Sequence, residues 1–312
     1  MHRLLNHPLS LESTFRIGGK AQELLLVEDR EELLKLLDSF YQAHKKYFLF
    51  AGGSNVLFSD DGLSFPVIKI TTGEVSDGED LNTLTADAGA PLSLLISSAL
   101  ARGLGGLEAL SGIPGSVGGA LVGNAGAYGQ SISDTLIKVE VWQRGKVFTL
   151  SKKECHFVYR SSIFKKELFD AVILSATFLL KPSKREILQK ESARIIATRL
   201  LKYSPRLACP GSFFKNVLLE DVPPAILKTI PKEKIVHGKI PAGFLLETVG
   251  ALGAKNGDVC VASHHANLFI NTNKATAQEV CSLAWELKEK VEKKWNISLV
   301  PEVVILPQGV LF

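Results

Sequence analysis

Apolar residues recur along this chain with two periods, and these periods divide it into predicted helices and strands. A helical period over 29–44 predicts an amphipathic helix with Leu33, Leu34, Leu37 and Tyr41 on its inner side. Alternating residues on either side of Arg144-Gly145 predict a hairpin. Further segments predict a helix at 92–102 and strands at 48–51, 67–70, 83–88, 137–143, 147–150 and 171–180.

The pattern changes at Pro182-Ser183, which marks a predicted boundary. Ser183 with Glu186 fits a capping box that would open a charged helix to about residue 202. A second capping box, Thr276 with Glu279, predicts another helix. Strands are predicted at 259–262, 268–270 and 302–306. Together the elements indicate an α+β chain in three parts, which are residues 1–182, a connector helix in 183–205, and residues 206–312.

The composition is that of an ordinary globular protein, since 46% of the 312 residues are hydrophobic and 22% are charged. The net charge of +4 suits anionic small molecules but falls short of the basic face that nucleic-acid binding needs. No apolar run reaches membrane-spanning length, and the start from Met1 to Pro8 is too short and polar for a signal peptide. We therefore expect a cytoplasmic protein without nucleic-acid or membrane partners. The sequence does not determine the oligomeric state, for which a monomer is the expectation.

Cysteine and histidine usage argues against a metal site. The four cysteines are widely spaced and contain no Cys-x-x-Cys, which predicts reduced thiols. Cys260 lies near His264 and His265, and Cys155 adjoins His156, but neither grouping has the spacing of a zinc site. We expect no metal, and we assign neither His264 nor His265 a catalytic role.

Two glycine-rich segments carry the first chemical signal. They read AGGSNVL at 51–57 and, about sixty residues later, SGIPGSVGGA at 111–120 followed by GNAGAYG at 123–129. Glycine lets a backbone approach a ligand closely and turn its N–H groups toward it, which suits a diphosphate. A single cluster of this kind is more often a structural turn. Two dense clusters, each flanked by apolar segments, favour a bound phosphorylated cofactor.

The common phosphate-binding patterns are absent from the sequence. Gly118 and Gly123 have the spacing of a P-loop, but Asn124 follows where lysine is required. The only Gly-x-Gly, at 103–105, has Glu108 at the sixth position, which excludes the usual dinucleotide fingerprint. A different loop geometry must hold the diphosphate.

Further segments make the prediction specific. They read TFRIGG at 14–19, YRSSIFK at 159–165, GSFFKN at 211–216, PAGFLLE at 241–247, HANLFIN at 265–271 and PEV at 301–303. In this order, and together with both glycine segments, they resemble the UDP-N-acetylenolpyruvoylglucosamine reductases, the MurB family of peptidoglycan synthesis. The resemblance extends from about residue 14 to residue 306.

The resemblance implies a fold and a reaction. The fold would be an FAD-binding domain of the vanillyl-alcohol oxidase/p-cresol methylhydroxylase type over 1–182, plus a C-terminal α+β substrate-binding domain over 206–312. The reaction would be reduction of UDP-N-acetylglucosamine enolpyruvate to UDP-N-acetylmuramate, with non-covalent FAD as cofactor and NADPH as co-substrate. The space between Lys202 and Gly211 leaves little room for an extra tyrosine-bearing loop, so the chain resembles the short type of the family.

Three residues match the family's catalytic positions. By resemblance Arg160 stabilises negative charge that develops near the substrate carboxylate, Ser212 donates a proton to the alpha carbon, and Glu302 is the acidic partner. Taken alone, each has a plainer interpretation: a surface ion pair for the arginine, a turn for the serine, and a solvated strand edge for the glutamate. Only the surrounding motifs favour the catalytic interpretation.

The remaining site assignments also come from the resemblance. FAD would be wrapped by residues from both glycine segments, namely Gly52, Gly53, Ser54, Asn55, Val56, Leu57, Ser111, Gly112, Ile113, Pro114, Gly115, Ser116, Gly118, Gly119, Asn124, Ala125 and Gly126. Arg16 would steady these segments or contact FAD. The substrate would be bound by Tyr159, Lys215 and Asn216. The chain departs from the family pattern at Val217, where proline is usual, and at Ser204, which replaces glutamine before Pro205.

Two other functions are compatible with the same residues. An FAD-dependent oxidase of the same fold would pass electrons to oxygen, often from a covalently tethered flavin. A non-catalytic nucleotide-binding module would bind FAD without turnover. The order and number of the matching segments favour the reductase.

Overall fold

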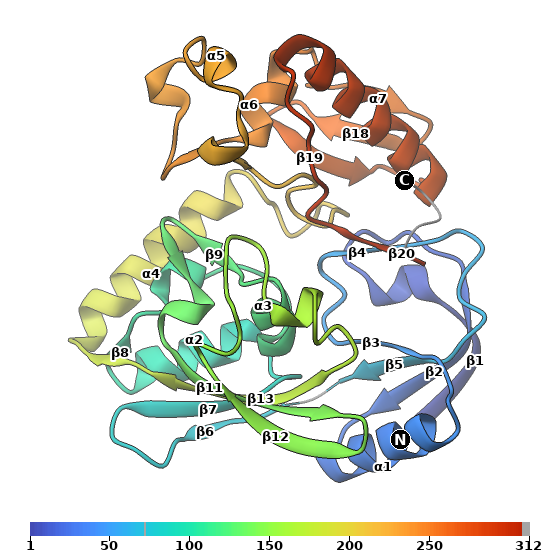
Figure 1. The fold of residues 1–312 in the computed structure, drawn as a ribbon, viewed down its shortest axis with the longest axis vertical. Coiled ribbons are helices and arrows are strands. Elements are labelled where there is room, and N and C mark those ends of the chain that lie inside the picture. Colours follow the sequence, from blue (N-terminus) through green and yellow to red (C-terminus); the bar gives the residue numbers. More distant parts are fainter. Residues whose placement is uncertain (72, 308–312) are drawn as a thin grey trace. The chain divides into compact units, whose positions relative to one another are not determined.

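The computed structural model describes residues 1–71 and 73–307, which form the predicted mixture of helices and strands (Figure 1). The chain divides into two compact units. The first comprises Met1–Asn6, Gln22–Gly52 and Ser64–Leu201, and the second comprises His7–Ala21, Gly53–Leu63 and the chain from Lys202 onward. The domain limits near residues 182 and 205 stay a prediction.

The first sheet of the first unit has four strands in the order β1-β2-β5-β3. Its strands are β1 (His2–Pro8), β2 (Lys20–Val27), β3 (Phe48–Phe50) and β5 (Val67–Ile70), and β5 runs parallel to both β2 and β3. Helix α1 (Arg30–Gln42) packs against this sheet through Leu33, Leu37 and Phe40. Tyr41, predicted on the inner side, is exposed, and the neighbouring Phe40 is buried instead.

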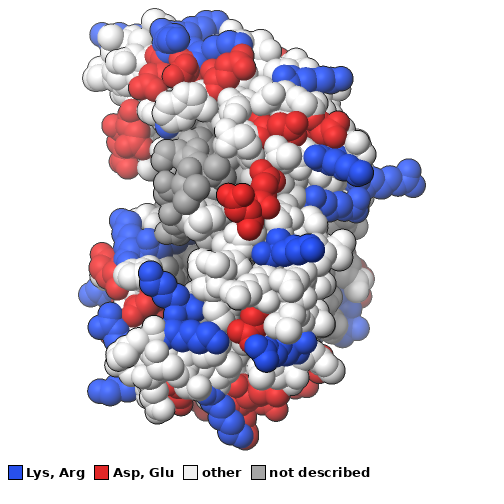
Figure 2. Space-filling model, turned by 90° about the vertical axis from the view of Figure 1, so that its right-hand side faces the viewer, with Lys and Arg blue, Asp and Glu red and all other residues white. Residues whose placement is uncertain are grey.

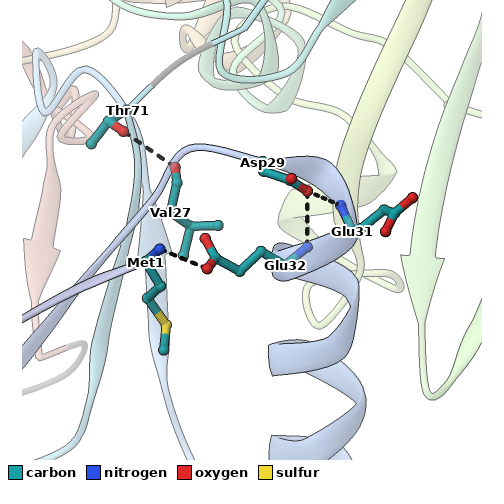
Figure 3. Close-up of polar contacts among 6 residues, drawn as sticks. All are labelled: Met1, Val27, Asp29, Glu31, Glu32 and Thr71. Carbon is teal, nitrogen blue, oxygen red and sulfur yellow. Dashed lines mark hydrogen bonds and ion pairs between the residues drawn. The ribbon is translucent and has the colours of Figure 1, made fainter.

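The start of α1 is fixed by a side-chain cap. Asp29 accepts hydrogen bonds from the backbone N–H groups of Glu31 and Glu32, at 2.6 and 3.1 Å (Figure 3). The terminal amine of Met1 donates to Oε1 of Glu32 at 2.6 Å. The two bonds to Asp29 satisfy helix N–H groups that would otherwise lack partners, so the helix begins where the sequence predicts.

The second sheet of the first unit is antiparallel, with five strands in the order β12-β11-β13-β7-β6. Its strands are β6 (Val75–Asp77), β7 (Thr83–Asp87), β11 (Leu136–Gln143), β12 (Lys146–Ser151) and β13 (Val172–Leu179). Residues of β7, β11 and β13 share a core with helices α2 (Leu92–Ala101) and α3 (Val117–Val122). The hairpin predicted around Arg144-Gly145 is confirmed as β11 and β12.

Helix α4 (Arg185–Leu200) confirms the predicted connector helix but not its predicted capping box. The helix begins after Lys184, and no side chain caps it. The preceding Lys181–Pro182 forms β14, which pairs with β8 (Leu104–Gly105), and the N–H of Ser183 donates to the carbonyl of Gly103 at 2.8 Å. Ser183 therefore continues this strand pairing and does not start the helix.

The second unit has a three-stranded antiparallel sheet, β17-β18-β19, formed by Lys255–Asn256, Val259–Ala262 and His265–Asn271. Helices α6 (Ala242–Glu247) and α7 (Ala277–Trp295) contribute to its core, in which Phe213, Phe214 and Phe269 pack together. The capping box of Thr276 and Glu279 is confirmed at the start of α7. The unit's other strand pairs are β4–β20, from Val56–Phe58 and Val304–Leu306, and β15–β16, from Val217–Leu218 and Lys239–Ile240.

The remaining described elements are short. They are α5 (Pro224–Leu227), β9 (Gly126–Ala127), β10 (Gln130–Ser131) and six 3-10 turns at Leu9–Glu12, Glu108–Leu110, Ile132–Asp134, Ile163–Lys165, Leu219–Asp221 and Lys232–Lys234.

Basic and acidic side chains are interspersed on the face drawn in Figure 2, without a broad area of one sign. This mixture agrees with the small net charge of +4. Within 1–71 and 73–307, no helix combines the length and the apolar character needed to cross a bilayer.

Candidate active site

The two glycine-rich segments meet in the first unit. A Cβ atom added to Gly52 would lie 2.9 Å from the Cα of Gly115, so the two backbones touch where neither residue has a side chain. A pocket of about 310 Å³ opens beside this contact. Its described lining residues come from both segments and from neighbouring strands and loops: Ala51, Gly52, Lys69, Ile70, Thr71, Gly89, Pro91, Gly115 and Ser116.

The second glycine segment continues into α3 and then into a left-handed turn. Ser116 caps α3 by accepting a hydrogen bond from the N–H of Gly119 at 3.2 Å. Gly118 packs against Ala88, where an added Cβ would lie 2.9 Å from the Cβ of Ala88. Asn124 follows the helix at φ +42°, and its Nδ2 donates to the carbonyl of Val158 at 3.0 Å.

The side-chain oxygen of Asn124 is buried and has no hydrogen-bond partner among the residues that the structure describes. A buried polar atom without a partner costs free energy, and a native structure usually supplies a water or ligand to it. Asn124 lies at the end of the helix that the second glycine segment opens. Its oxygen is therefore an acceptor that a water or a bound ligand would satisfy.

Arg160 occupies a tight turn in the first unit. Val158 and Ser161 exchange two backbone hydrogen bonds, of 3.1 and 3.2 Å, and Arg160 between them has φ +53°. A non-glycine residue in this conformation is strained, and such strain often accompanies function. The guanidinium lies 5.5 Å from the centre of the Tyr159 ring.

The turn that carries Arg160 is anchored to α3. Asn124 holds the carbonyl of Val158, and Oγ of Ser162 donates to the carbonyl of Val122 at 2.8 Å. The Nζ of Lys165 donates to the carbonyl of Arg160 at 3.2 Å. The second glycine segment and the predicted catalytic arginine are thus one connected structure.

Ser212 and Glu302 lie on neighbouring extended segments of the second unit. Ser212 forms an isolated bridge with Leu268 of β19, and the N–H of Phe213 donates to the carbonyl of Asn267 at 3.0 Å. On the other side, the N–H of Glu302 donates to the carbonyl of Phe213 at 2.8 Å. One residue therefore links the predicted proton donor to the predicted acidic partner.

The later part of the first glycine segment belongs to the second unit. Nδ2 of Asn55 donates to the carbonyl of Glu302 at 3.0 Å, and the carbonyl of Gly53 accepts from the N–H of Thr14 at 3.2 Å. Val56 and Leu57 lie in β4, and the side chain of Leu57 is buried in the core. For Leu57, the predicted cofactor contact could only be made by the backbone.

Several other predicted residues have structural partners. Oγ of Ser111 lies 2.8 Å from Oγ of Ser192 on α4. Oδ1 of Asn216 accepts from the N–H of Ala242 at 3.1 Å, at the start of α6, and the N–H of Lys215 donates to the carbonyl of Val300. Ligand contacts at Ser54, Gly112, Ile113, Pro114, Ala125 and Gly126 stay predictions.

Two residues beside Ser212 were not predicted. The hydroxyl of Tyr203 lies 2.8 Å from Oγ of Ser212 and 3.4 Å from Nε2 of His265. Burial, followed by the positive charges of Lys202 and His264, lowers the pKa of His265 to about 4. The HANLFIN segment pointed to His265 without indicating its partner, and no sequence pattern pointed to Tyr203.

The four cysteines are free, and burial is the first cause of the raised pKa of each. The pKa rises to about 11 for Cys155 and about 12 for Cys281. Among the described residues, no group of three or more histidine, cysteine, aspartate or glutamate side chains is placed to hold a metal ion.

Known proteins match both parts of the chain. Residues 204–306 match the C-terminal domain model of UDP-N-acetylenolpyruvoylglucosamine reductase, and residues 21–151 match an FAD binding domain. The chain is 38% identical to the UDP-N-acetylenolpyruvoylglucosamine reductase of Solibacter usitatus, over 95% of this chain and 94% of that protein. This chain belongs to the UDP-N-acetylenolpyruvoylglucosamine reductase (MurB) family.

Other members agree with this assignment. The reductase of Carboxydothermus hydrogenoformans is 35% identical over 97% of this chain and 93% of that protein. The crystal structure of the MurB enzyme from Thermus caldophilus superimposes with a TM-score of 0.74 at 28% identity, covering 98% of each chain. The predicted family, fold class and FAD-binding domain are confirmed.

We expect Gly52→Ala to weaken FAD binding at least about tenfold, because the new Cβ would press on the backbone of Gly115 and force the two glycine segments apart. Equilibrium titration of cofactor-free protein with FAD measures the effect. Gly123→Ala is the control, since its Cβ would lie 3.6 Å from the nearest atom, in ordinary contact. Equal affinity of Gly52→Ala and wild type would contradict a cofactor site at this contact.

His265 makes stability depend on pH. Its folded pKa of about 4 lies below its ordinary value of 6.5, so the unfolded state binds more protons. The contribution of neutral His265 to the free energy of unfolding is fully present above about pH 6.5 and is lost as the pH falls toward about 4. Between about pH 7 and pH 4.5 the loss should be on the order of 2 kcal/mol.

Urea unfolding at the two pH values measures this loss in wild type and in His265→Gln, which should lose less on acidification. His2→Gln is the control, because His2 is exposed and belongs to the other unit. If acidification destabilised wild type and His265→Gln equally, His265 would not be the group responsible.

Proposed function

We propose that this chain catalyses the NADPH-dependent, FAD-mediated reduction of UDP-N-acetylglucosamine enolpyruvate to UDP-N-acetylmuramate in peptidoglycan precursor synthesis. The observation that carries the proposal is the relationship to a named reductase over 95% of the chain. Residues 1–182 would bind FAD, 183–205 would connect, and 206–312 would bind substrate. The enzyme would act in the cytoplasm as a monomer, on a small nucleotide-sugar substrate.

The first unit fits non-covalently bound FAD. The contact of Gly52 with Gly115 leaves no space for side chains, so backbone N–H groups can approach a diphosphate closely. The buried Oδ1 of Asn124 offers an acceptor to a cofactor hydroxyl. When bound, FAD supplies the hydride chemistry, which needs NADPH as the source of the hydride.

Arg160 would stabilise negative charge on the substrate carboxylate as the hydride arrives at the neighbouring alkene carbon. The guanidinium is planar and matches a carboxylate with two parallel hydrogen bonds. Its turn is anchored to α3 through Asn124 and Ser162, which limits reorganisation during the reaction. Tyr159, beneath the guanidinium, would contact the substrate.

Ser212 would complete the reduction by donating its hydroxyl proton to the alpha carbon. A serine hydroxyl is a weak acid, but the carbanion next to a carboxylate is a strong base, so the transfer has a driving force. Glu302 would be the acidic group that acts together with Ser212. Its backbone N–H donates to the carbonyl of Phe213, the residue that follows Ser212. Lys215 and Asn216, which follow Ser212 in sequence, would bind the UDP portion.

The purified protein should be yellow, and NADPH should bleach it in the absence of oxygen. Addition of UDP-N-acetylglucosamine enolpyruvate should then restore the colour and form one UDP-N-acetylmuramate for each NADPH. Reoxidation by oxygen but not by the enolpyruvyl substrate would support the oxidase alternative, whereas bound FAD that NADPH cannot bleach would support the non-catalytic module. Either outcome would contradict the proposed function.

Ser212→Ala should leave bleaching by NADPH intact and slow the substrate-driven return of colour by about 10²-fold, because the proton donor is lost. Stopped-flow absorbance measures the two half-reactions separately. Ser263→Ala, an exposed serine in the same unit, is the control. Equal slowing of both half-reactions would show that Ser212 has a structural role instead.

A further inference from the structure

Four groups of the second unit form a chain of polar contacts that ends at Ser212. The N–H of Asn267 donates to Nδ1 of His265 at 3.1 Å. Nε2 of His265 lies 3.4 Å from the hydroxyl of Tyr203, which lies 2.8 Å from Oγ of Ser212. Tyr203 follows α4 in the sequence, and His265 belongs to β19. The fold therefore brings these polar groups together from separate segments of the sequence.

The direction of the hydrogen bonds follows from the first link. A backbone N–H can only donate, so Nδ1 of His265 must accept and cannot carry a proton. Because the lowered pKa of His265 keeps the imidazole neutral near pH 7, its single proton lies on Nε2. The ring therefore donates to the oxygen of Tyr203.

The hydrogen bond between Tyr203 and Ser212 can have the same direction, with Tyr203 as the donor. Tyr203 has one hydroxyl proton, and the hydroxyl that accepts from His265 can donate that proton to Oγ of Ser212 at 2.8 Å. If Ser212 donated to Tyr203 instead, its proton would point away from any substrate. The opposite polarity leaves the proton of Ser212 available to a different acceptor.

We propose that Tyr203 is a positioning residue for the reduction, which donates a hydrogen bond to Ser212 and so directs the serine proton toward the substrate carbon. The inference rests on the proposed function. In the proton transfer, the O–H bond of Ser212 breaks and a C–H bond forms at the alpha carbon, which leaves negative charge on Oγ. The hydroxyl of Tyr203 stabilises this charge, and the serine recovers its proton from water after product release.

The surroundings of Tyr203 hold its hydroxyl in place. Its ring lies 5.7 Å from the His265 ring, tilted by 49°. Both rings are partly buried, and Nε2 of the neighbouring His264 contacts the carbonyl of Lys202 at 3.0 Å, which ties the residue before Tyr203 to the start of β19. A hydroxyl held in this way needs little reorganisation when charge appears on the serine.

Tyr203→Phe tests the inference because it removes the hydroxyl and keeps the ring. We expect bleaching by NADPH to be unchanged and the substrate-driven return of colour to slow by about 10- to 100-fold, as for the loss of a hydrogen bond to a charged group. Binding of the enolpyruvyl substrate should be unchanged. Tyr41→Phe, an exposed tyrosine on α1, is the matched control.

A second readout uses cofactor-free wild-type protein and needs no turnover. Nitrogen NMR of labelled histidine at about pH 7 should find His265 neutral with its proton on Nε2. In Tyr203→Phe, the chemical shift of Nε2 should change, because the tyrosine oxygen that accepts its hydrogen bond is gone. The chemical shift of Nδ1 should remain that of an unprotonated nitrogen.

The possible results separate the two proposals. If wild type is not reoxidised by the enolpyruvyl substrate, the proposed function fails and the inference fails with it. If wild type is reoxidised but Tyr203→Phe matches it, or slows both half-reactions equally, only the inference is overturned. A proton on Nδ1 of His265, or a charged ring near neutral pH, would also overturn it.

Discussion

The proposed chemistry of the second unit depends on the buried side chain of Asn267. Its Oδ1 accepts from the N–H of Phe214 at 2.9 Å, and its Nδ2 donates to the carbonyl of Phe214 at 2.8 Å. The backbone carbonyl of Asn267 holds Phe213, and its N–H holds the ring of His265. One residue thus sets the position of Ser212 and the proton position on His265. Because each of these groups is satisfied at Asn267, a shift of the serine segment would break several buried hydrogen bonds together.

In the first unit, the proposed cofactor site would present backbone groups rather than side chains to the ligand. The glycine segments reach each other only because Gly52 and Gly115 lack Cβ atoms. The strained turn of Arg160 is tied to the same structure by Asn124, whose Nδ2 donates to the carbonyl of Val158. Within the described part of the chain, Oδ1 of Asn124 has no hydrogen-bond partner. The predicted cofactor-binding residues and the predicted carboxylate-binding arginine therefore share a support within this unit.

Much of the fold could be predicted because its signals are local. Helix α1 has both its period and the cap of Asp29, and α7 has a complete capping box at Thr276. The capping box predicted at Ser183 was wrong, because the pairing of β14 with β8 outweighed the local preference of serine for a helix cap. Tyr203 could not be predicted, because its importance comes from contacts with Ser212 and His265 that no periodicity or short motif encodes. The family motifs indicated Ser212, but only the structure showed what lies beside it.

The neutral state of His265 and the direction of the hydrogen bonds have a common cause. A protonated imidazole would carry hydrogens on both nitrogens, and Nδ1–H would then face the N–H of Asn267. Burial and the charge of Lys202 oppose protonation in addition. A neutral chain of donors also suits the proposed chemistry better than a charged one. A cation beside Tyr203 would favour loss of the tyrosine proton, and a tyrosinate could only accept from Ser212, which would turn the serine proton away from the substrate.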